Sequence, residues 1–262
     1  MSMNGAPIRT RLALALAVMA AAVAVAVVAI GQAGAAPSAP KSNEAIKSGA
    51  GPGWPKILHP SDFVARVDNA YFPLKPGSTW RYRGRDDHGR FADRMHVRHK
   101  TKTILGVKTT IVHDVVLRDG KPREVTNDWY VQDHDGNVWY FGEDTKTLDR
   151  HGHLKSREGS FQAGQNGAQP GVLFPGDPKV GQTARQEFFK GHAEDHFKVR
   201  SRHAKASVPF VSTKRAVRTA ERTPLEPHVL DNKFYVRGVG TVREVTVKGP
   251  TERLELVSFH RG

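Results

Sequence analysis

Apolar and polar residues alternate along most of the chain after residue 79, and this is the period of an extended strand. Met95 and Val97, for example, alternate with Arg94, His96 and Arg98. Segments of this kind predict strands at 79–83, 94–99, 107–117, 125–131, 138–141, 183–189, 196–202, 213–223, 232–237, 241–247 and 253–259. Turn residues separate them without a long helical period in between, so the pattern predicts a mainly β chain with an antiparallel meander.

Several of these segments carry apolar residues on both faces. Trp129 and Val131 point to one side of a strand and Tyr130 to the other, and Trp139 and Tyr140 oppose each other in the next strand. A flat sheet with one wet face does not need two apolar faces. We therefore expect a sheet that is curled on itself or closed.

The chain also contains two similar stretches. The frame K-x-G-x-T-x-R at 75–81 recurs at 179–185, about 104 residues later. Trp129-Tyr130-Val131 followed by Gly136 is echoed at a similar offset by Phe234-Tyr235-Val236 followed by Gly240. The agreement predicts an internal repeat, 72–173 and 174–262, within a single β domain at 60–262. The alternative is a chance recurrence of Gly-x-Thr before a strand.

The first residues have the order of a secretory signal peptide. Arg9 and Arg11 precede an unbroken apolar run at 12–30, and the small residues Ala33-Gly34-Ala35 follow it. This order predicts a signal peptide at 1–35 that is cleaved after Ala35, and hence an exported protein. The alternative is an uncleaved membrane anchor, since the apolar run is just long enough to span a bilayer.

The segment after the signal is rich in Pro, Gly, Ser and Ala, so 36–59 is predicted to be a flexible linker. A short helix capped by Ser61 is expected next, with Phe63, Val64 and Val67 on one side. The chain contains no cysteine, which excludes disulfides, a thiolate nucleophile, a Cys-based zinc site and a lipid anchor on cysteine.

The formal net charge is +14, and such a positive field attracts polyanions. Basic residues cluster at positions 94, 98, 100 and 102 and again at 198, 200, 202 and 205, and all but the last share one strand parity within their cluster. An anionic cell-wall polymer is therefore a candidate partner, whereas no motif indicates specific nucleic-acid binding. The alternative is that the charge only keeps the surface soluble.

Two polar segments contain residue types that can bind a metal ion. His192, Glu194 and His196 share one face if they lie on a strand, but that spacing holds the two histidines too far apart for one ion. The segment 133–137 resembles the start of a calcium loop but lacks the glutamate at its end, and a hairpin turn with Gly136 at positive φ is favoured. We predict no metal site.

Catalysis is not indicated by any recognisable motif. Asp128, Glu143, Asp144 and Glu194 include pairs that could serve a hydrolase, but their separations decide that question and the sequence does not contain them. Neither a nucleophile elbow nor a phosphate-binding glycine loop is present. A non-catalytic protein without a cofactor is favoured, and an extracellular carboxylate-dependent hydrolase remains an alternative.

Aromatic residues are densest in three of the predicted strands. Together with a neighbouring glutamate they form the predicted ligand-binding set: Trp80, Tyr82, Trp129, Tyr130, Trp139, Tyr140 and Glu143. If one face of a curled sheet is not filled, these rings would line an apolar pocket with polar edges. The alternative is that the rings fill the core themselves.

Several strings resemble a family of bacterial exported proteins that has no assigned activity. They are DNAYFPL at 68–74, GSTWRY at 77–82, DWY at 128–130, GNVWYFGED at 136–144 and GVG at 238–240. The resemblance implies export and transfers no catalytic residue. The G-x-T-W-x-Y opening more loosely resembles half-barrel lipoprotein carriers, but the apparent repeat and the lack of a covering helix depart from that pattern.

These observations together predict an exported, non-catalytic binding protein for an apolar or amphipathic ligand such as a lipid. A polyanion-binding or scaffold module is the main alternative.

Overall fold

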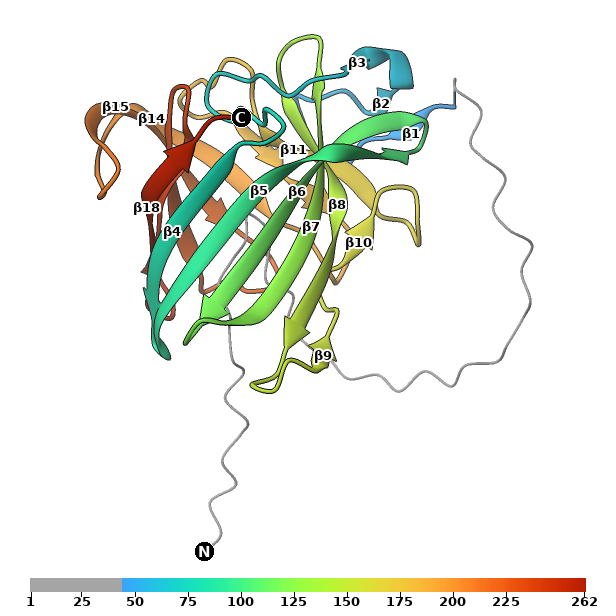
Figure 1. The fold of residues 1–262 in the computed structure, drawn as a ribbon. Helices are drawn as coiled ribbons and strands as arrows, with labels where there is room; N and C mark the ends of the chain where they lie inside the picture. Colours follow the sequence, from blue (N-terminus) through green and yellow to red (C-terminus); the bar gives the residue numbers. More distant parts are fainter. Residues whose placement is uncertain (1–43) are drawn as a thin grey trace, which may run out of the picture.

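The computed structural model describes residues 44–262, which form one sixteen-stranded antiparallel sheet and one small two-stranded sheet. These residues contain no α-helix. The prediction of a mainly β, antiparallel and curled fold is therefore confirmed (Figure 1). The predicted signal peptide and the first part of the predicted linker lie outside the described residues.

The sheet consists of two meanders that follow each other in sequence. The first contains β4 (Thr79–Asp86), β5 (Gly89–Ile104), β6 (Val107–Arg118), β7 (Lys121–Asp133), β8 (Val138–Leu148) and β11 (Gln169–Phe174). The second contains β12 (Thr183–Arg185), β13 (Glu187–Phe188), β14 (His196–Ser207), β15 (Ser212–Arg222), β16 (Leu230–Val236), β17 (Gly240–Lys248) and β18 (Glu252–His260). Pairing of β18 with β4 joins the two meanders edge to edge.

The segment 183–188 brings the two ends of the sheet together. Its first part, β12, pairs with β14, whereas its second part, β13, pairs with β11 at the opposite end of the strand order. The sheet therefore nearly closes into a barrel, which Figure 1 shows in side view. Closure gives every strand an inward and an outward face, which explains why the sequence carries apolar residues on both.

Strand alternation sorts side chains between these faces. In β4, Trp80 and Tyr82 are buried while Arg81 and Arg83 are exposed. The other strands repeat this sorting, and nearly all of the strand positions predicted from the sequence lie within observed strands. β11 was not predicted, because it contains a proline and a glycine that are unfavourable in a strand.

The N-terminal described segment corrects two predictions. β1 (Ile46–Lys47) pairs with β2 (Ile57–Leu58), and Ile46 and Leu58 are buried in the core, so this part of the predicted linker is not a free tether. The expected short helix is a single 3₁₀ turn, η1 (Pro60–Asp62), followed by β3 (Phe63–Val64), which pairs with β7. Burial of these apolar side chains holds the segment in place, although its content of Pro, Gly, Ser and Ala predicts a flexible linker.

Two further short strands, β9 (Leu154–Ser156) and β10 (Phe161–Gln162), pair with the edge of β8 that lies away from β7. The predicted hairpin at 133–137 connects β7 and β8, and Gly136 has φ 80°. The prediction of this turn is confirmed.

The turns that open the two meanders are built alike. Gly77 donates a backbone hydrogen bond to Val97 at 2.9 Å, and Gly181 donates one to Val199 at 2.9 Å. Both glycines lie at positive φ, 86° and 92°. The internal repeat itself stays a prediction.

Within residues 44–262, no helix has the length and apolar character needed to cross a lipid bilayer.

The contact that closes the sheet requires glycine at position 171, because a Cβ atom does not fit there. A Cβ atom added at Gly171 would lie 2.4 Å from the backbone carbon of Gln186 and 2.5 Å from the carbonyl oxygen of Arg185. We predict that Gly171→Ala separates β11 from β13, because backbone on both sides has to shift. Hydrogen–deuterium exchange should therefore speed up at residues 183–188.

The matched control is Gly120→Ala, which adds the same methyl group in an open turn between β6 and β7. It carries a cost of about 1 kcal/mol for its left-handed backbone and should leave exchange at 183–188 unchanged. Unchanged exchange at 183–188 in Gly171→Ala would contradict the assigned closure.

Candidate functional site

The structure divides the predicted aromatic set between the two faces of the sheet. Four members of the set are buried in the interior of the curled sheet: Tyr82, Tyr130, Tyr140 and Glu143. Cross-strand pairing places them on the inner face together with the buried residues of the neighbouring strands. Trp129 and Trp139 have the opposite parity and lie on the outer face, where other segments cover them. The set is therefore not one pocket.

Trp80 is packed by the protein itself. Its indole Nε1 donates to the carbonyl oxygen of Val239 at 2.7 Å, and its ring stacks on Phe259 at 4.9 Å. The cavity beside Trp80 and Tyr82 has a volume of only about 10 Å³. A space of this size does not hold an organic ligand.

The other two tryptophans of the set also have protein partners. Trp139 donates to Asp133 Oδ2 at 2.7 Å and meets Phe63 edge to face at 6.3 Å. Lys102 Nζ lies 3.3 Å from the centre of the Trp129 ring, a cation–π contact. These contacts favour the alternative in which the tryptophans stabilise the fold.

The interior contains an unusual number of acidic side chains. Asp128 lies opposite Glu143 across β7 and β8, and Tyr140 donates to Asp128 Oδ1 at 2.7 Å. Thr145 donates to Glu143 Oε2 at 2.6 Å. We call the following eight side chains the interior carboxyl cluster: Asp93, Asp114, Glu124, Asp128, Glu143, Glu187, Glu221 and Glu244.

One lysine lies among these groups. Lys233 Nζ is 2.9 Å from Glu221 Oε2 and 3.8 Å from Glu244 Oε2. Both carboxylate oxygens of Asp114 and both of Glu187 are buried without a hydrogen-bond donor. A single cation does not neutralise eight carboxylates, so most of the cluster must bind protons.

Burial is the largest cause of the raised pKa values in the cluster. It raises the pKa of Asp93 to about 7 and that of Asp128 to about 7. The pKa of Glu124 rises to about 8 through burial and the nearby charges of Asp93 and Asp128. The pKa of Asp114 lies well above its ordinary value for the same reason, reinforced by the charge of Asp93.

Sequence reasoning found only Asp128 and Glu143 of this cluster. The available signal was parity: Asp93 and Asp114 occupy the same alternating positions as the apolar residues Met95 and Val116. An acidic residue at an inward position marks a buried carboxyl group once the sheet is known to close.

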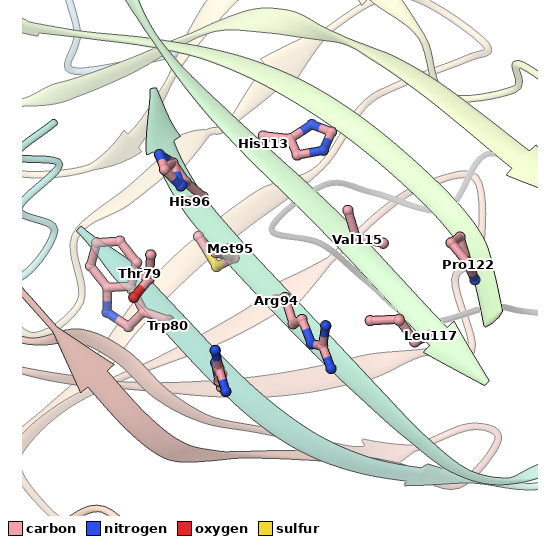
Figure 2. Close-up of a pocket in the computed structure, with 10 residues that line it drawn as sticks. Thr79, Trp80, Arg94, Met95, His96, His113, Val115, Leu117 and Pro122 are labelled. Atoms are coloured by element: carbon pink, nitrogen blue, oxygen red, sulfur yellow. The ribbon is translucent and has the colours of Figure 1, made fainter. Parts of the chain in front are cut away.

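A groove with an apolar floor lies on the outer face of the first meander. We call it the first outer groove, and its volume is about 390 Å³. Figure 2 shows Arg94 of β5, Val115 and Leu117 of β6 and Pro122 of β7 side by side across neighbouring strands. Arg81 of β4 lies opposite Arg94 in register and also lines the groove.

Two histidines lie at one end of the first outer groove. His96 and His113 face each other across β5 and β6, and His113 Nδ1 is 3.0 Å from Asn127 Oδ1. Burial, with smaller effects from the charges of Arg98 and His96, lowers the pKa of His113. Arg81 and Arg94 supply the permanent positive charge of the groove.

A second groove lies on the outer face of the second meander. This second outer groove has a volume of about 400 Å³ and spans β12, β14, β15 and β16. Its cationic lining residues are Lys198, Arg200, Arg218 and Arg222. The predicted basic cluster at 198–205 therefore contributes to a real concave surface, although only two of its four members line it.

The residues weighed as metal ligands have other contacts. His192 stacks on Phe189 at 4.4 Å, and Glu194 accepts a hydrogen bond from the backbone of Gly191. Asp133 accepts hydrogen bonds from the backbone and side chain of Asn137, which stabilises the hairpin turn. Across the part of the chain that the structure describes, no three His, Asp or Glu side chains form a group suited to a metal ion.

The carboxylates weighed for hydrolysis do not share an open site. Asp128 and Glu143 are buried in the interior, and neither lines one of the two outer grooves. Asp144 forms an ion pair with Arg157 at 2.6 Å on the outer side of β8. Glu194 lies in the loop before β14.

Comparison with known proteins gives a weak likeness in fold. No protein-family profile matches the chain, and no curated protein sequence is similar to it. A protein of Bacteroides fragilis NCTC 9343, thought to be exported and with a YmcC-like fold, aligns at 11% identity with a TM-score of 0.43. A protein of Parabacteroides distasonis ATCC 8503, thought to be a lipoprotein, aligns at 11% identity with a TM-score of 0.40.

Each alignment covers 74% of this chain and 100% of the other. Likenesses at this level carry no information about function.

The interior carboxyl cluster predicts an unusual dependence of stability on pH. Asp93, Asp128 and Glu124 have folded-state pKa values raised to about 7, 7 and 8, so their stabilising contribution is complete below the unfolded-state pKa near 4. That contribution is lost as pH rises through the folded-state values. We predict that the free energy of unfolding falls between about pH 4 and pH 8.

The measurement is urea unfolding across this pH range. In the double variant Asp93→Asn, Asp114→Asn the free energy of unfolding should decrease less with rising pH, because amide side chains stay neutral. The control Asp87→Asn, at an exposed turn position, should leave the slope unchanged. A wild-type stability that rises over this range would contradict the assignment.

Proposed function

We propose that this protein is an exported, non-catalytic binding protein whose ligand is an amphipathic anion, held in the first outer groove. The observation that carries the proposal is the pairing of an apolar floor with two cationic side chains. Val115, Leu117 and Pro122 form the floor, and Arg81 and Arg94 lie beside it. An acidic lipid or a fatty acid has this combination of chemistry.

Binding energy in such a groove comes from two sources. Covering the apolar floor with a hydrocarbon chain removes apolar surface from water, at roughly 25 cal/mol per Å². Arg81 and Arg94 are cross-strand neighbours, so one carboxylate or phosphate head group can bridge both guanidinium groups. The volume of about 390 Å³ suits a head group and the first part of a chain.

This proposal moves the binding site from the interior to the outer face. The sequence indicated an amphipathic ligand among the aromatic residues. Of these, Trp80 also lines the first outer groove, whereas Trp129 and Trp139 are held by protein contacts elsewhere. The one lysine of the interior carboxyl cluster, Lys233, is already paired with Glu221, so the cluster offers no cation to an anionic head group. Export rests on the signal pattern of residues 1–35.

Dodecanoate, below the concentration at which it forms micelles, is the probe for the first outer groove. We predict that isothermal titration calorimetry detects saturable binding to the wild-type protein. The double variant Arg81→Gln, Arg94→Gln should weaken it by about tenfold or more, because the bridging charge-assisted hydrogen bonds are lost. Leu117→Asp should weaken it further by placing a carboxylate in the floor.

The matched control is Arg218→Gln, Arg222→Gln, which removes the same charge from the second outer groove. Equal weakening by both double variants would show a general charge effect and would refute the proposed site. Dodecanol, which lacks the anionic group, should bind much more weakly than dodecanoate.

A further inference from the structure

The second outer groove occupies the same place in its meander as the first. Each groove lies on the outer face of four neighbouring strands, β4 to β7 in the first meander and β12, β14, β15 and β16 in the second. Two concave surfaces are thus presented on the outside of one nearly closed sheet. Their linings differ.

Cross-strand register shows how the linings differ. Arg94 pairs with Val115 in the first meander, and Lys198 pairs with Ala220 in the second. The opening turns bind Val97 in one meander and Val199 in the other, so the pair Lys198–Ala220 corresponds in place to His96–His113. The next outward pair, His196–Arg222, corresponds to Arg94–Val115. In the second outer groove Arg222 therefore takes the place of the apolar Val115, and Lys198 takes the place of His96.

We infer that the second outer groove is a separate binding site for a hydrophilic polymer with repeated phosphate groups. Lys198, Arg200, Arg218 and Arg222 line it, and no carboxylate does. None of these four side chains forms an ion pair with a carboxylate within residues 44–262. Their charge is therefore available to a ligand.

Within the described residues, these four cationic side chains form no ion pairs because the carboxylate of the same strands points to the inner face of the sheet. Glu221 precedes Arg222 on β15 but points into the sheet, where it pairs with Lys233. The charge of Arg222 contributes to lowering the pKa of His196, after burial as the largest cause. Positive charge is thus concentrated along the groove.

The cations are spread along the groove and match several anionic groups better than one. Arg218 and Arg222 are four residues apart on one strand, a separation of roughly 13 Å at about 3.3 Å per residue. When both side chains extend away from the strand, one phosphate does not bridge them. A chain of phosphates can, and the planar guanidinium groups match phosphate oxygens in pairs.

The remaining lining residues favour a polymer without bases. Thr183 and Asn232 add small polar side chains, Leu230 adds one apolar side chain, and no Phe, Tyr or Trp lines the groove. Proteins that bind single-stranded nucleic acid usually provide aromatic rings on which bases stack. A phosphate polymer such as polyphosphate or a polyol phosphate of a cell wall fits this surface better.

The test uses a short linear polyphosphate as the probe and the whole mature protein. Calorimetry at several salt concentrations should show binding that weakens steeply with salt. Arg218→Gln, Arg222→Gln should reduce the affinity by about tenfold or more and make the salt dependence shallower. Lys198→Gln, Arg200→Gln should do the same, and it serves as an independent variant if the first is poorly folded.

The control Arg81→Gln, Arg94→Gln removes an equal charge from the first outer groove and should leave polyphosphate affinity nearly unchanged. Equal weakening by all three double variants would overturn the assignment, because it would show attraction to the whole positive surface. Equal affinity for polyglutamate, or for inorganic phosphate, would overturn the specificity for a phosphate chain. Dodecanoate binding, measured in parallel, should not respond to Arg218→Gln, Arg222→Gln, so this inference and the proposed function fail separately.

Discussion

The double pairing of the segment 183–188 is the contact on which the rest of the fold depends. Without it, β11 and β14 would be open edges of a long twisted sheet, and the inner face would be exposed to water. With it, each strand has one face that is shielded and one that meets solvent. The approach of Gly171 to the backbone of Gln186 shows how closely this seam is packed.

Closure turns a simple alternation in sequence into a separation of charge. The inward positions of the strands hold eight carboxyl groups with one lysine among them, whereas the basic residues lie outward. Burial keeps many of those carboxyl groups protonated, since an isolated buried carboxylate is very costly. The outer surface is consequently more positive at neutral pH than the sequence alone indicates, and both outer grooves lie in that field.

Strand positions could be predicted from the sequence because alternation is a local property. β5, β6 and β15 all follow it over long stretches. β11 and the β1–β2 pair could not be predicted in this way, because their extended form depends on partners far away in the chain. Alternation also shows that Trp129 and Tyr130 face opposite sides, but it does not show which side is the interior.

The outer grooves were beyond sequence reasoning for a related reason. The first takes its lining from four strands that each contribute a few residues, and only cross-strand register brings Arg81, Arg94 and Val115 together. The predicted basic clusters were partly right, since Arg94 and Lys198 do line the grooves. Val115 and Arg222, which occupy corresponding places and distinguish the two sites, are brought into the grooves only by the assembled sheet.

Carbodiimide labelling of carboxyl groups in the native protein at neutral pH, mapped by peptide mass spectrometry, tests the separation of charge most directly. Asp93, Asp114 and Glu187 should remain unlabelled while exposed Asp87 and Asp119 are modified, and all should react after unfolding. Labelling of Asp93, Asp114 and Glu187 in the native state at the rate of Asp87 would contradict a closed sheet that shields its carboxyl groups.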